Sequence, residues 1–295
     1  NNLFGSFSAT LKPFKWLSFS STNTLTLTNV NTNDYLDSRT YSGNHSRNEM
    51  SNGVLKVDDE RSWTFLTSNI LRLQHSFGEH NLSGLVGQEW YERHTRSSHI
   101  EMYDQMIAGE RNVGGFSKQG DKTNPAVIPT GAERESGSFS VFSEVNYNYA
   151  GKYMASVSFR TDGSTNFGKD NRYGTFYSFS GSWLVSREAF MARQDVVSNL
   201  KLRMSYGTSG KEAGMDYLNY TLYSTSNTTF DYYRDHPAYQ SAYGATINQL
   251  GNDQLSWETA YNLNIGVDVA LLNNRISLSA DWYKRRNSDL IMSTT

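Results

Sequence analysis

Alternation of apolar and polar side chains with a period of two residues constrains this chain more than any other feature. From 257 to 271 the odd positions are mostly apolar or aromatic, whereas the even positions are polar or small. After residue 274 the parity reverses, and Ile276, Leu278 and Trp282 continue the apolar set. An antiparallel hairpin needs this reversal if both of its strands are to keep their apolar side chains on one face. The period therefore predicts β-strands rather than helices.

Two hairpins follow directly from this parity. The two asparagines at 273–274 tolerate the positive φ of a type I′ turn, so a two-residue turn there pairs Leu271 with Ile276. Around residue 150 the apolar positions are odd on both sides, which requires a loop with an odd number of residues. We therefore predict a three-residue loop at 149–151, with Gly151 in the left-handed conformation.

Two further turns lie nearer the start of the chain. A two-residue turn at 78–79 pairs Leu73 with Gly84 and keeps the apolar groups on one face. Pro13 is placed in a similar turn between the first two predicted strands. Each of these turns joins strands that are antiparallel neighbours, so the sheet is predicted to be a meander.

The predicted strands are long, and their connections sort into two kinds. About ten strands are expected, at roughly 2–11, 16–28, 61–76, 80–95, 137–149, 152–162, 171–185, 199–208, 257–271 and 275–287. A strand of about 12 residues that rises about 3.3 Å per residue and tilts by about 45° climbs about 28 Å, which is the thickness of a membrane. Long loops at about 29–60, 96–136 and 209–256 alternate with tight turns. Two connections deviate from this pattern. The loop at 163–170 is short, and on the turn side 186–193 is predicted as a short helix with Ser186 as N-cap. Short turns at one end and long loops at the other are typical of an outer-membrane β-barrel.

A soluble β-sandwich also has one apolar and one polar face, so alternation alone leaves both folds open. Strand length favours the barrel, as does a polar face made mostly of Asn, Ser, Thr, Gly and acidic residues. Aromatic residues near strand ends are candidates for interfacial girdles: Trp16, Trp63, Trp90, Tyr153, Tyr173, Trp257 and Tyr261. Beyond Trp282 on the apolar face, Lys284 and Arg286 are placed at the outer interface, where anionic lipid head groups lie. The predicted fold class is an all-β antiparallel transmembrane barrel.

Composition excludes several other classes. The chain has 27 basic and 29 acidic side chains, a formal charge of −2, which argues against nucleic-acid binding. It has no cysteine, so disulfides, thiol nucleophiles and Cys-ligated metals are excluded. The histidines and the acidic run at 58–60 lack the spacing of a metal site, and 207–211 lacks that of a phosphate-binding loop. We expect no catalytic residue, no cofactor and no metal.

Both ends of the chain look unfinished. Strand-like alternation begins almost at residue 1, without an initiator Met or a leader sequence. The last residues, 290–295, likewise look like the interior of a longer chain. About ten strands would also leave two unpaired edges, which hydrocarbon does not tolerate. We therefore expect residues 1–295 to be part of a larger closed barrel.

Several stretches of the second half resemble one known family. They are 142–149 with 152–154, 158–168 with 171–174, 200–210, and 255–259 continuing through 264–268 to 274–276. In order and spacing, from about Ser138 to Leu290, they resemble the SusC/RagA group of TonB-dependent outer-membrane transporters. Residues 1–137 match more loosely, through 77–82 and 87–89.

The resemblance implies a 22-stranded barrel with an N-terminal plug in the outer membrane of a Gram-negative bacterium. Members of the family import large nutrients, so the implied cargo is an oligosaccharide or an oligopeptide. The implied partners are a SusD-like surface lipoprotein, outer-membrane lipid and the TonB complex, which supplies the energy. Two alternatives remain open, namely a siderophore- or cobalamin-type receptor and a β-rich surface adhesin.

Two groups of residues are candidates for binding. Tyrosine planes flanked by acids and an arginine suit sugars, peptides or the partner lipoprotein, and one loop offers Asp231, Tyr232, Tyr233, Arg234, Tyr239 and Tyr243. The second group is predicted to face the lumen, where polar side chains anchor a plug or bind water. It consists of Glu144, Asn146, Asn148, Arg160, Asp162, Asn262, Asn264, Asp268 and Asp281.

Overall fold

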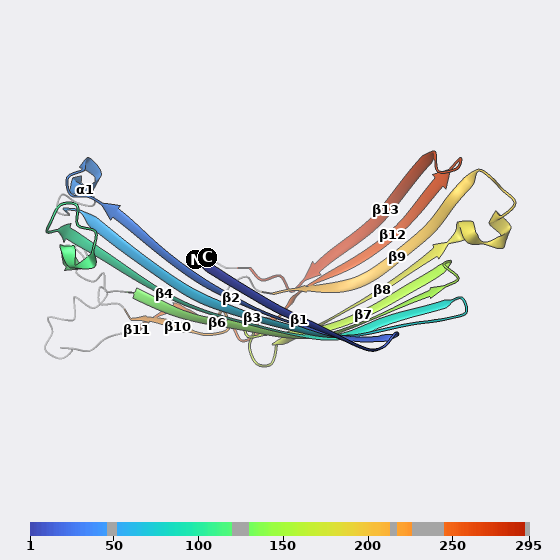
Figure 1. Cartoon of the computed structure of the whole chain (residues 1–295), viewed down its shortest axis with the longest axis horizontal. Coiled ribbons are helices and arrows are strands. Elements are labelled where there is room, and N and C mark those ends of the chain that lie inside the picture. The colour runs from blue at the N-terminus through green and yellow to red at the C-terminus, as the bar shows by residue number, and fades with distance from the viewer. Residues whose placement is uncertain (46–51, 120–129, 213–216, 226–244, 293–295) are drawn as a thin grey trace.

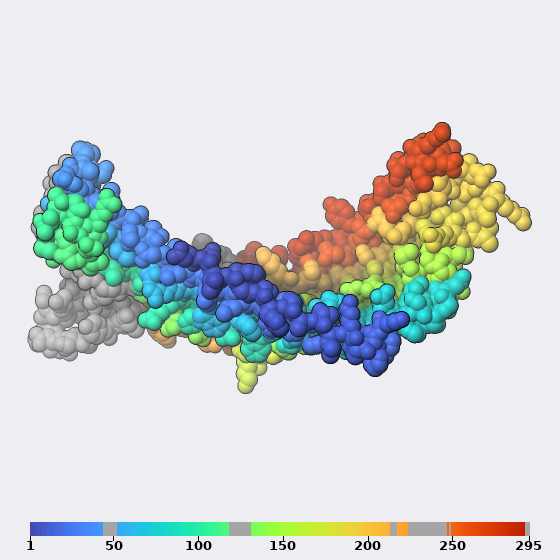
Figure 2. Space-filling view, in the orientation of Figure 1, coloured from blue at the N-terminus to red at the C-terminus, as the bar shows by residue number. Residues whose placement is uncertain are grey.

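The computed structural model describes residues 1–45, 52–119, 130–212, 217–225 and 245–292. They form one eleven-stranded antiparallel sheet and a separate two-stranded one. The large sheet is a single curved layer that bends into an open trough (Figure 1). Figure 2 shows the same curvature in the space-filling view. The trough is the shape expected for part of the wall of a barrel.

The strands of the large sheet follow one another in chain order. Ten of them make the continuous path: β1 (Asn2–Phe14), β2 (Leu17–Leu36), β3 (Val54–Phe77), β4 (His80–Gln105), β6 (Thr130–Tyr149), β7 (Tyr153–Ser164), β8 (Tyr173–Leu184), β9 (Val197–Lys211), β12 (Glu258–Leu271) and β13 (Ile276–Ser288). The short β5 (Phe116–Gln119) pairs with β4, and β10 (Leu222–Thr225) pairs with β11 (Ala245–Gln249).

Helical segments among the described residues are short. They are α1 (Tyr41–His45) and the 3₁₀ turns η1 (Val113–Gly115), η2 (Val185–Arg187) and η3 (Ala189–Met191). None of the helices in this part of the chain is long and apolar enough to cross a membrane.

Strands β2, β3 and β4 are longer than the alternation predicted, so the boundaries of two predicted loops were wrong. Pairing of β2 with β3 runs on to Leu36 and Val54, inside the predicted loop at 29–60. Pairing of β3 with β4 likewise continues to Tyr103, inside the predicted loop at 96–136. These extensions are rich in charged and polar residues on both faces, so they carry little alternation to detect, although their main chains still pair.

Two of the predicted turns are confirmed. Leu271 pairs with Ile276, and Asn273 and Asn274 both have positive φ, at 57° and 64°. The turn at 78–79 pairs Phe77 with His80. Farther along the two strands, Leu73 pairs with Gly84 as predicted.

Three local predictions needed correction. The loop near residue 150 has three residues and Gly151 has positive φ, but it covers 150–152, since Tyr149 still pairs with Tyr153. Pro13 lies within β1 beside an irregularity in the pairing, and residues 15–16 make the turn. The segment predicted as a helix with Ser186 as N-cap forms two 3₁₀ turns instead. Ser186 lies inside the first of them, which has no side-chain cap, and its hydroxyl bonds Asn199.

The two faces of the sheet differ as predicted. Large apolar side chains cover one face, which we call the apolar face, and most of them are exposed. Leu278 is 60% exposed and Ile265 is 46% exposed, so neither lies in a compact hydrophobic nucleus. Side chains at the alternate positions form the polar face. A soluble sandwich would bury the apolar face under a second layer, and the described residues supply none.

A patch of polar side chains interrupts the apolar face. On β3, Asn69 lies on this face next to Leu71. The Asn69 amide Nδ2 donates to Oε1 of Gln88 on β4 at 3.2 Å. On β2, Asn23 Nδ2 donates to the Ser21 hydroxyl at 3.2 Å. Pairing within the patch offsets part of the cost of placing amides in an apolar environment.

We predict that Asn69→Leu lowers the free energy of unfolding by about 1–3 kcal/mol, because it leaves the Gln88 amide without its partner. The double variant N69L/Q88L removes both amides and should recover most of that loss. Urea unfolding of the full-length barrel in lipid vesicles measures both effects. Gln74→Leu, on the polar face of the same strand, is the control and should not be rescued by Q88L. A double variant as unstable as the sum of the two single variants would contradict the pairing.

Candidate functional site

An arginine-centred cluster lies on the polar face where β4, β6 and β7 meet. Arg160 Nε donates to Asp162 Oδ1 at 2.6 Å, and its Nη2 lies 3.2 Å from Glu89 Oε2 and 3.0 Å from the Ser140 hydroxyl. The guanidinium also lies over the ring of Phe142, 5.2 Å from its centroid. One cation thus ties three strands together on the face predicted to line the lumen.

Phe142 can lie flat because the neighbouring strand has glycine opposite it. A Cβ atom at Gly87 of β4 would overlap the Phe142 ring. An aromatic ring that covers a glycine on the next strand is a known way to stabilise glycine within a sheet. The ring stays close to the wall, and the arginine above it is held in place.

A second arginine cluster joins β9, β12 and β13. Arg203 makes a bidentate pair with Asp268, at 2.8 and 3.0 Å, and its Nη2 lies 3.2 Å from Asp281. The Ser279 hydroxyl donates to Asp268 Oδ1 at 2.7 Å. Gly266 lies beneath this crossing, where a Cβ atom would overlap both Arg203 and Asp281. The cluster carries two carboxylates for one guanidinium.

All nine residues predicted to face the lumen lie on the polar face. Besides the two clusters, Asn146 Nδ2 donates to Glu144 Oε1 at 2.6 Å, and Asn148 Oδ1 accepts the Gly151 N–H at 2.9 Å. The structure brings them together in local groups rather than in one site. Their contact with a plug or with water stays a prediction.

The predicted binding loop was placed within residues 209–256. Asp231, Tyr232, Tyr233, Arg234, Tyr239 and Tyr243 lie outside the described residues.

One of the residues predicted for the aromatic girdles packs within the protein instead. Trp257 packs against Phe167 and Phe176 with ring centroids 5.2 and 5.8 Å apart, and its indole N–H donates to the Arg172 carbonyl. Phe167 is fully buried. Trp257 therefore anchors the 165–172 loop instead of facing lipid. Trp63 and Trp90 lie well inside strands β3 and β4 rather than near their ends, because those strands extend beyond the predicted ends. Their place in an interfacial girdle stays a prediction.

Lys284 and Arg286 lie on the apolar face as predicted, since Lys284 pairs with Leu263 and Arg286 with Tyr261. Lys284 and Arg286 line one shallow depression together with Tyr206, Tyr261 and Leu263. Their contact with lipid head groups stays a prediction. At the turn end of the sheet, Tyr153 stacks on Trp183 with centroids 6.3 Å apart.

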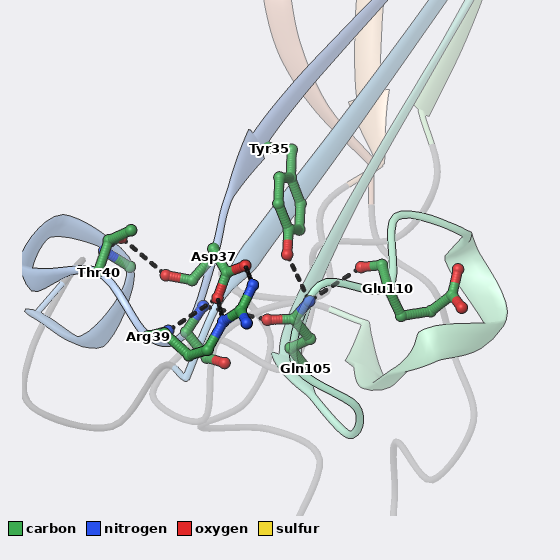
Figure 3. A network of polar contacts seen from close by, with 8 residues as sticks. Tyr35, Asp37, Arg39, Thr40, Gln105 and Glu110 are labelled. Atoms are coloured by element: carbon green, nitrogen blue, oxygen red, sulfur yellow. Dashed lines mark hydrogen bonds and ion pairs between the residues drawn. The ribbon is translucent and has the colours of Figure 1, made fainter.

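A compact polar network that the sequence analysis missed lies at the end of the sheet away from the tight turns (Figure 3). Its centre is the Gln105 side chain, which is almost fully buried. Gln105 Nε2 donates to the Tyr35 hydroxyl at 2.6 Å and to the Glu110 carbonyl at 2.9 Å, and Oε1 accepts the Ser38 N–H at 3.0 Å. One amide thus joins two segments far apart in the sequence, 35–38 and 105–110.

A small buried core supports this network, and we call the two together the knob. Val54, Leu55, Tyr103 and Phe116 are each at most 5% exposed. These residues lie in segments predicted as loops. Because they show no alternation in the sequence, no signal there marked them as core.

Two carboxylates order the backbone of the knob. The Asp37 carboxylate accepts hydrogen bonds from the side chain and main-chain N–H of Arg39, and these hold the pKa of Asp37 well below its usual range. The Glu110 carboxylate accepts the main-chain N–H groups of Asn112 and Arg111, each at 3.0 Å, which lowers its pKa from 4.5. Both groups stabilise the folded knob only while ionised.

We predict that the knob loosens as the pH falls below 4.5, the ordinary pKa of Glu110. A carboxyl whose pKa is lowered by folding contributes stability above its unfolded pKa and loses it as the pH falls through its folded pKa. Hydrogen exchange of residues 105–112, from about pH 5 to about pH 3, should therefore accelerate relative to a Glu110→Gln variant at the same pH. The variant corrects for the intrinsic pH dependence of exchange. Equal acceleration in both proteins would show that Glu110 does not order this segment.

No group of three or more histidine, aspartate or glutamate side chains within the described ranges is arranged to hold a metal ion. The chemistry of the polar face is that of hydrogen bonding and ion pairing.

Comparison with known proteins identifies the fold. The family model described as TonB dependent receptor-like, beta-barrel, matches residues 2–295. The chain belongs to this family. TonB-dependent receptor P3 of Formosa agariphila is 33% identical over 229 residues, which are 77% of this chain and 21% of the relative. SusC of Bacteroides thetaiotaomicron is 35% identical over 155 residues, or 52% of this chain and 15% of SusC.

A solved structure agrees with the sequence comparison. The structure of the RagAB peptide transporter superposes with a TM-score of 0.81 at 25% identity, covering 99% of this chain and 31% of that one. The chain is thus a SusC/RagA-type barrel segment and spans less than a third of each of these relatives. Barrels of this family lie in the outer membrane, with an apolar face toward lipid and a polar face toward the lumen.

In a TonB-dependent receptor the two ends of the sheet lie on opposite sides of the outer membrane. Tight turns face the periplasm and long loops face the outside, so the knob is extracellular. Proteins of this family are transporters and not enzymes, in agreement with the expectation from the sequence.

Proposed function

We propose that residues 1–295 supply part of the barrel wall of a TonB-energised importer of large nutrients. The cargo is an oligosaccharide or an oligopeptide, and a SusD-like surface lipoprotein works with the barrel on the outside. The observation that carries this proposal is the curved sheet, apolar outside and lined inside by hydroxyls, amides and arginine-centred ion pairs. Similarity to SusC and to the RagAB peptide transporter supports it.

The lumen-facing wall supports the passage of large polar cargo. A depression of about 570 Å³ is lined in part by hydroxyl and amide side chains of the polar face, among them Ser156, Ser180, Ser205 and Asn264. Such groups exchange hydrogen bonds readily with water, sugars and peptide groups.

Uptake in the source bacterium tests the function. Deleting the gene should abolish growth on either oligosaccharides or oligopeptides as sole nutrient, while growth on the corresponding monosaccharides or amino acids is unchanged. Loss of TonB should have the same effect, and a surface lipoprotein should copurify with the full-length protein in detergent. Normal growth on both classes of oligomer, without a copurifying lipoprotein, would refute the proposal.

The arginine clusters offer a second test, because we propose that they anchor a plug supplied elsewhere in the full-length protein. Arg203→Met leaves Asp268 and Asp281 without their cation, and the two carboxylates then repel each other. We predict that cells carrying this variant become more sensitive to vancomycin, which enters when a plug is loosened. Susceptibility assays measure the change.

Arg285→Gln is the matched control for this test. Arg285 lies on the same face and bonds Asn287 on its own strand, so its loss should leave the barrel closed. Equal vancomycin sensitivity in both variants, at equal surface expression, would show that the cluster has no special part in plug anchoring.

A further inference from the structure

Three turns at the periplasmic end are tied into one surface. We call residues 150–152, 185–196 and 272–275 the turn platform. Arg187 Nη1 donates to the Gly151 carbonyl at 3.4 Å, and the Leu272 N–H donates to the Val196 carbonyl at 2.9 Å. Figure 1 shows the 185–196 segment as a folded yellow lobe at the end of β8 and β9. Because the turns are bonded to one another, the platform presents its side chains in a defined arrangement.

One residue of the platform ties it to the apolar face of the wall. Its Glu188 accepts hydrogen bonds from the Tyr153 hydroxyl at 2.6 Å and from the Trp183 indole N–H at 3.0 Å. Both rings belong to the apolar face, since Tyr153 alternates with Val157 on β7 and pairs with Trp183 on β8. Glu188 therefore holds the 185–196 segment against two aromatic rings of the apolar face, while Ser186 of the same segment bonds Asn199 at the end of β9.

The charge of the platform differs from that of the whole chain. It carries four basic residues, Lys152, Arg187, Arg193 and Arg275, and two acidic ones, Glu188 and Asp195, whereas the chain has a formal charge of −2. Glu188 is already engaged by Tyr153, by Trp183 and by the Lys152 ammonium at 3.5 Å. These contacts lower the pKa of Glu188, so it stays ionised and paired. The exposed Arg187 and Arg193 leave the surface with an excess of positive charge.

Apolar side chains project from the same surface. Phe190 is 65% exposed, Val196 57% and Leu272 49%. Aromatic and aliphatic groups interleaved with arginine and lysine suit the boundary between lipid head groups and acyl chains. A surface that faced only water would gain nothing from exposing them.

We propose that the turn platform binds the periplasmic leaflet of the outer membrane through anionic phospholipids. Arg187 and Arg193 contact lipid phosphates, and Phe190 and Val196 enter the region just below the head groups. Positive charge next to a membrane surface attracts anionic lipid. The platform thereby sets the depth of this side of the barrel in the bilayer.

Vesicles of defined composition test the proposal with the full-length protein. Phosphatidylglycerol added to phosphatidylcholine vesicles should raise the thermal unfolding midpoint of the wild-type barrel, followed by heat-modifiable gel mobility. The double variant R187Q/R193Q should lose at least half of this phosphatidylglycerol-dependent rise and keep the midpoint seen in phosphatidylcholine alone. Lys12→Gln with Lys15→Gln, at the β1–β2 turn of the same end, is the matched control and should keep the rise. Equal loss in both double variants, or no rise in the wild type, overturns the proposal.

A second measurement does not depend on the stability of any charge variant. A photoreactive phenylalanine analogue at position 190 of the full-length protein in outer membranes should cross-link to phospholipid. Cross-linking to a periplasmic protein instead would assign the platform to a protein partner and refute the lipid assignment. Failure to cross-link to lipid would also refute it, provided that the same analogue at Phe159 on the lipid-facing wall labels lipid.

Discussion

Main-chain hydrogen bonding between neighbouring strands is the constraint on which the rest of this structure depends. In hydrocarbon each unpaired N–H or C=O costs several kcal/mol, so a spanning sheet must pair every strand on both sides. Within the described sheet β1 and β13 are the two outer strands, and every strand between them on the main path has two neighbours. With the main chain paired, the alternation of side chains decides which residues face lipid and which face the lumen.

Because the wall is one layer thick, it cannot draw its stability from a conventional core. The described chain buries few large side chains, and most of these lie in the knob or around Trp257. Elsewhere the lumen face is held by cross-strand contacts, in which Arg160 and Arg203 each connect three strands. Glycines at 87 and 266 make room for these contacts, so the lumen wall stays thin where charged groups gather.

The two ends of the sheet are stabilised in different ways. At the periplasmic end the strands reverse in tight turns, and these turns bond to one another to form the platform. At the extracellular end strands β2, β3 and β4 continue beyond the bilayer and need a core of their own, which Leu55 and Phe116 supply. The Gln105 amide then joins the loops above that core.

Periodicity predicted those features of the fold, such as hairpin turns, that depend on a single pair of strands. The turns at 78–79 and 273–274 agree with the structure because parity excludes a register shifted by one residue, and Gly78 and the two asparagines tolerate the positive φ of a turn. The loop near residue 150 was displaced by one position, since two registers that differ by two residues keep the same parity. The knob escaped prediction because Tyr35, Gln105 and Glu110 belong to segments without alternation.

By itself, the sequence determined the antiparallel meander, the two faces and the family, since each depends on short-range pattern and on motifs read along the chain. Only the tertiary structure decided which charged groups meet: Arg160 contacts Glu89, 71 positions away, and Trp257 packs on Phe167 rather than on lipid. These contacts depend on strand stagger and sheet curvature, which arise from all the pairings together. No local pattern encodes them.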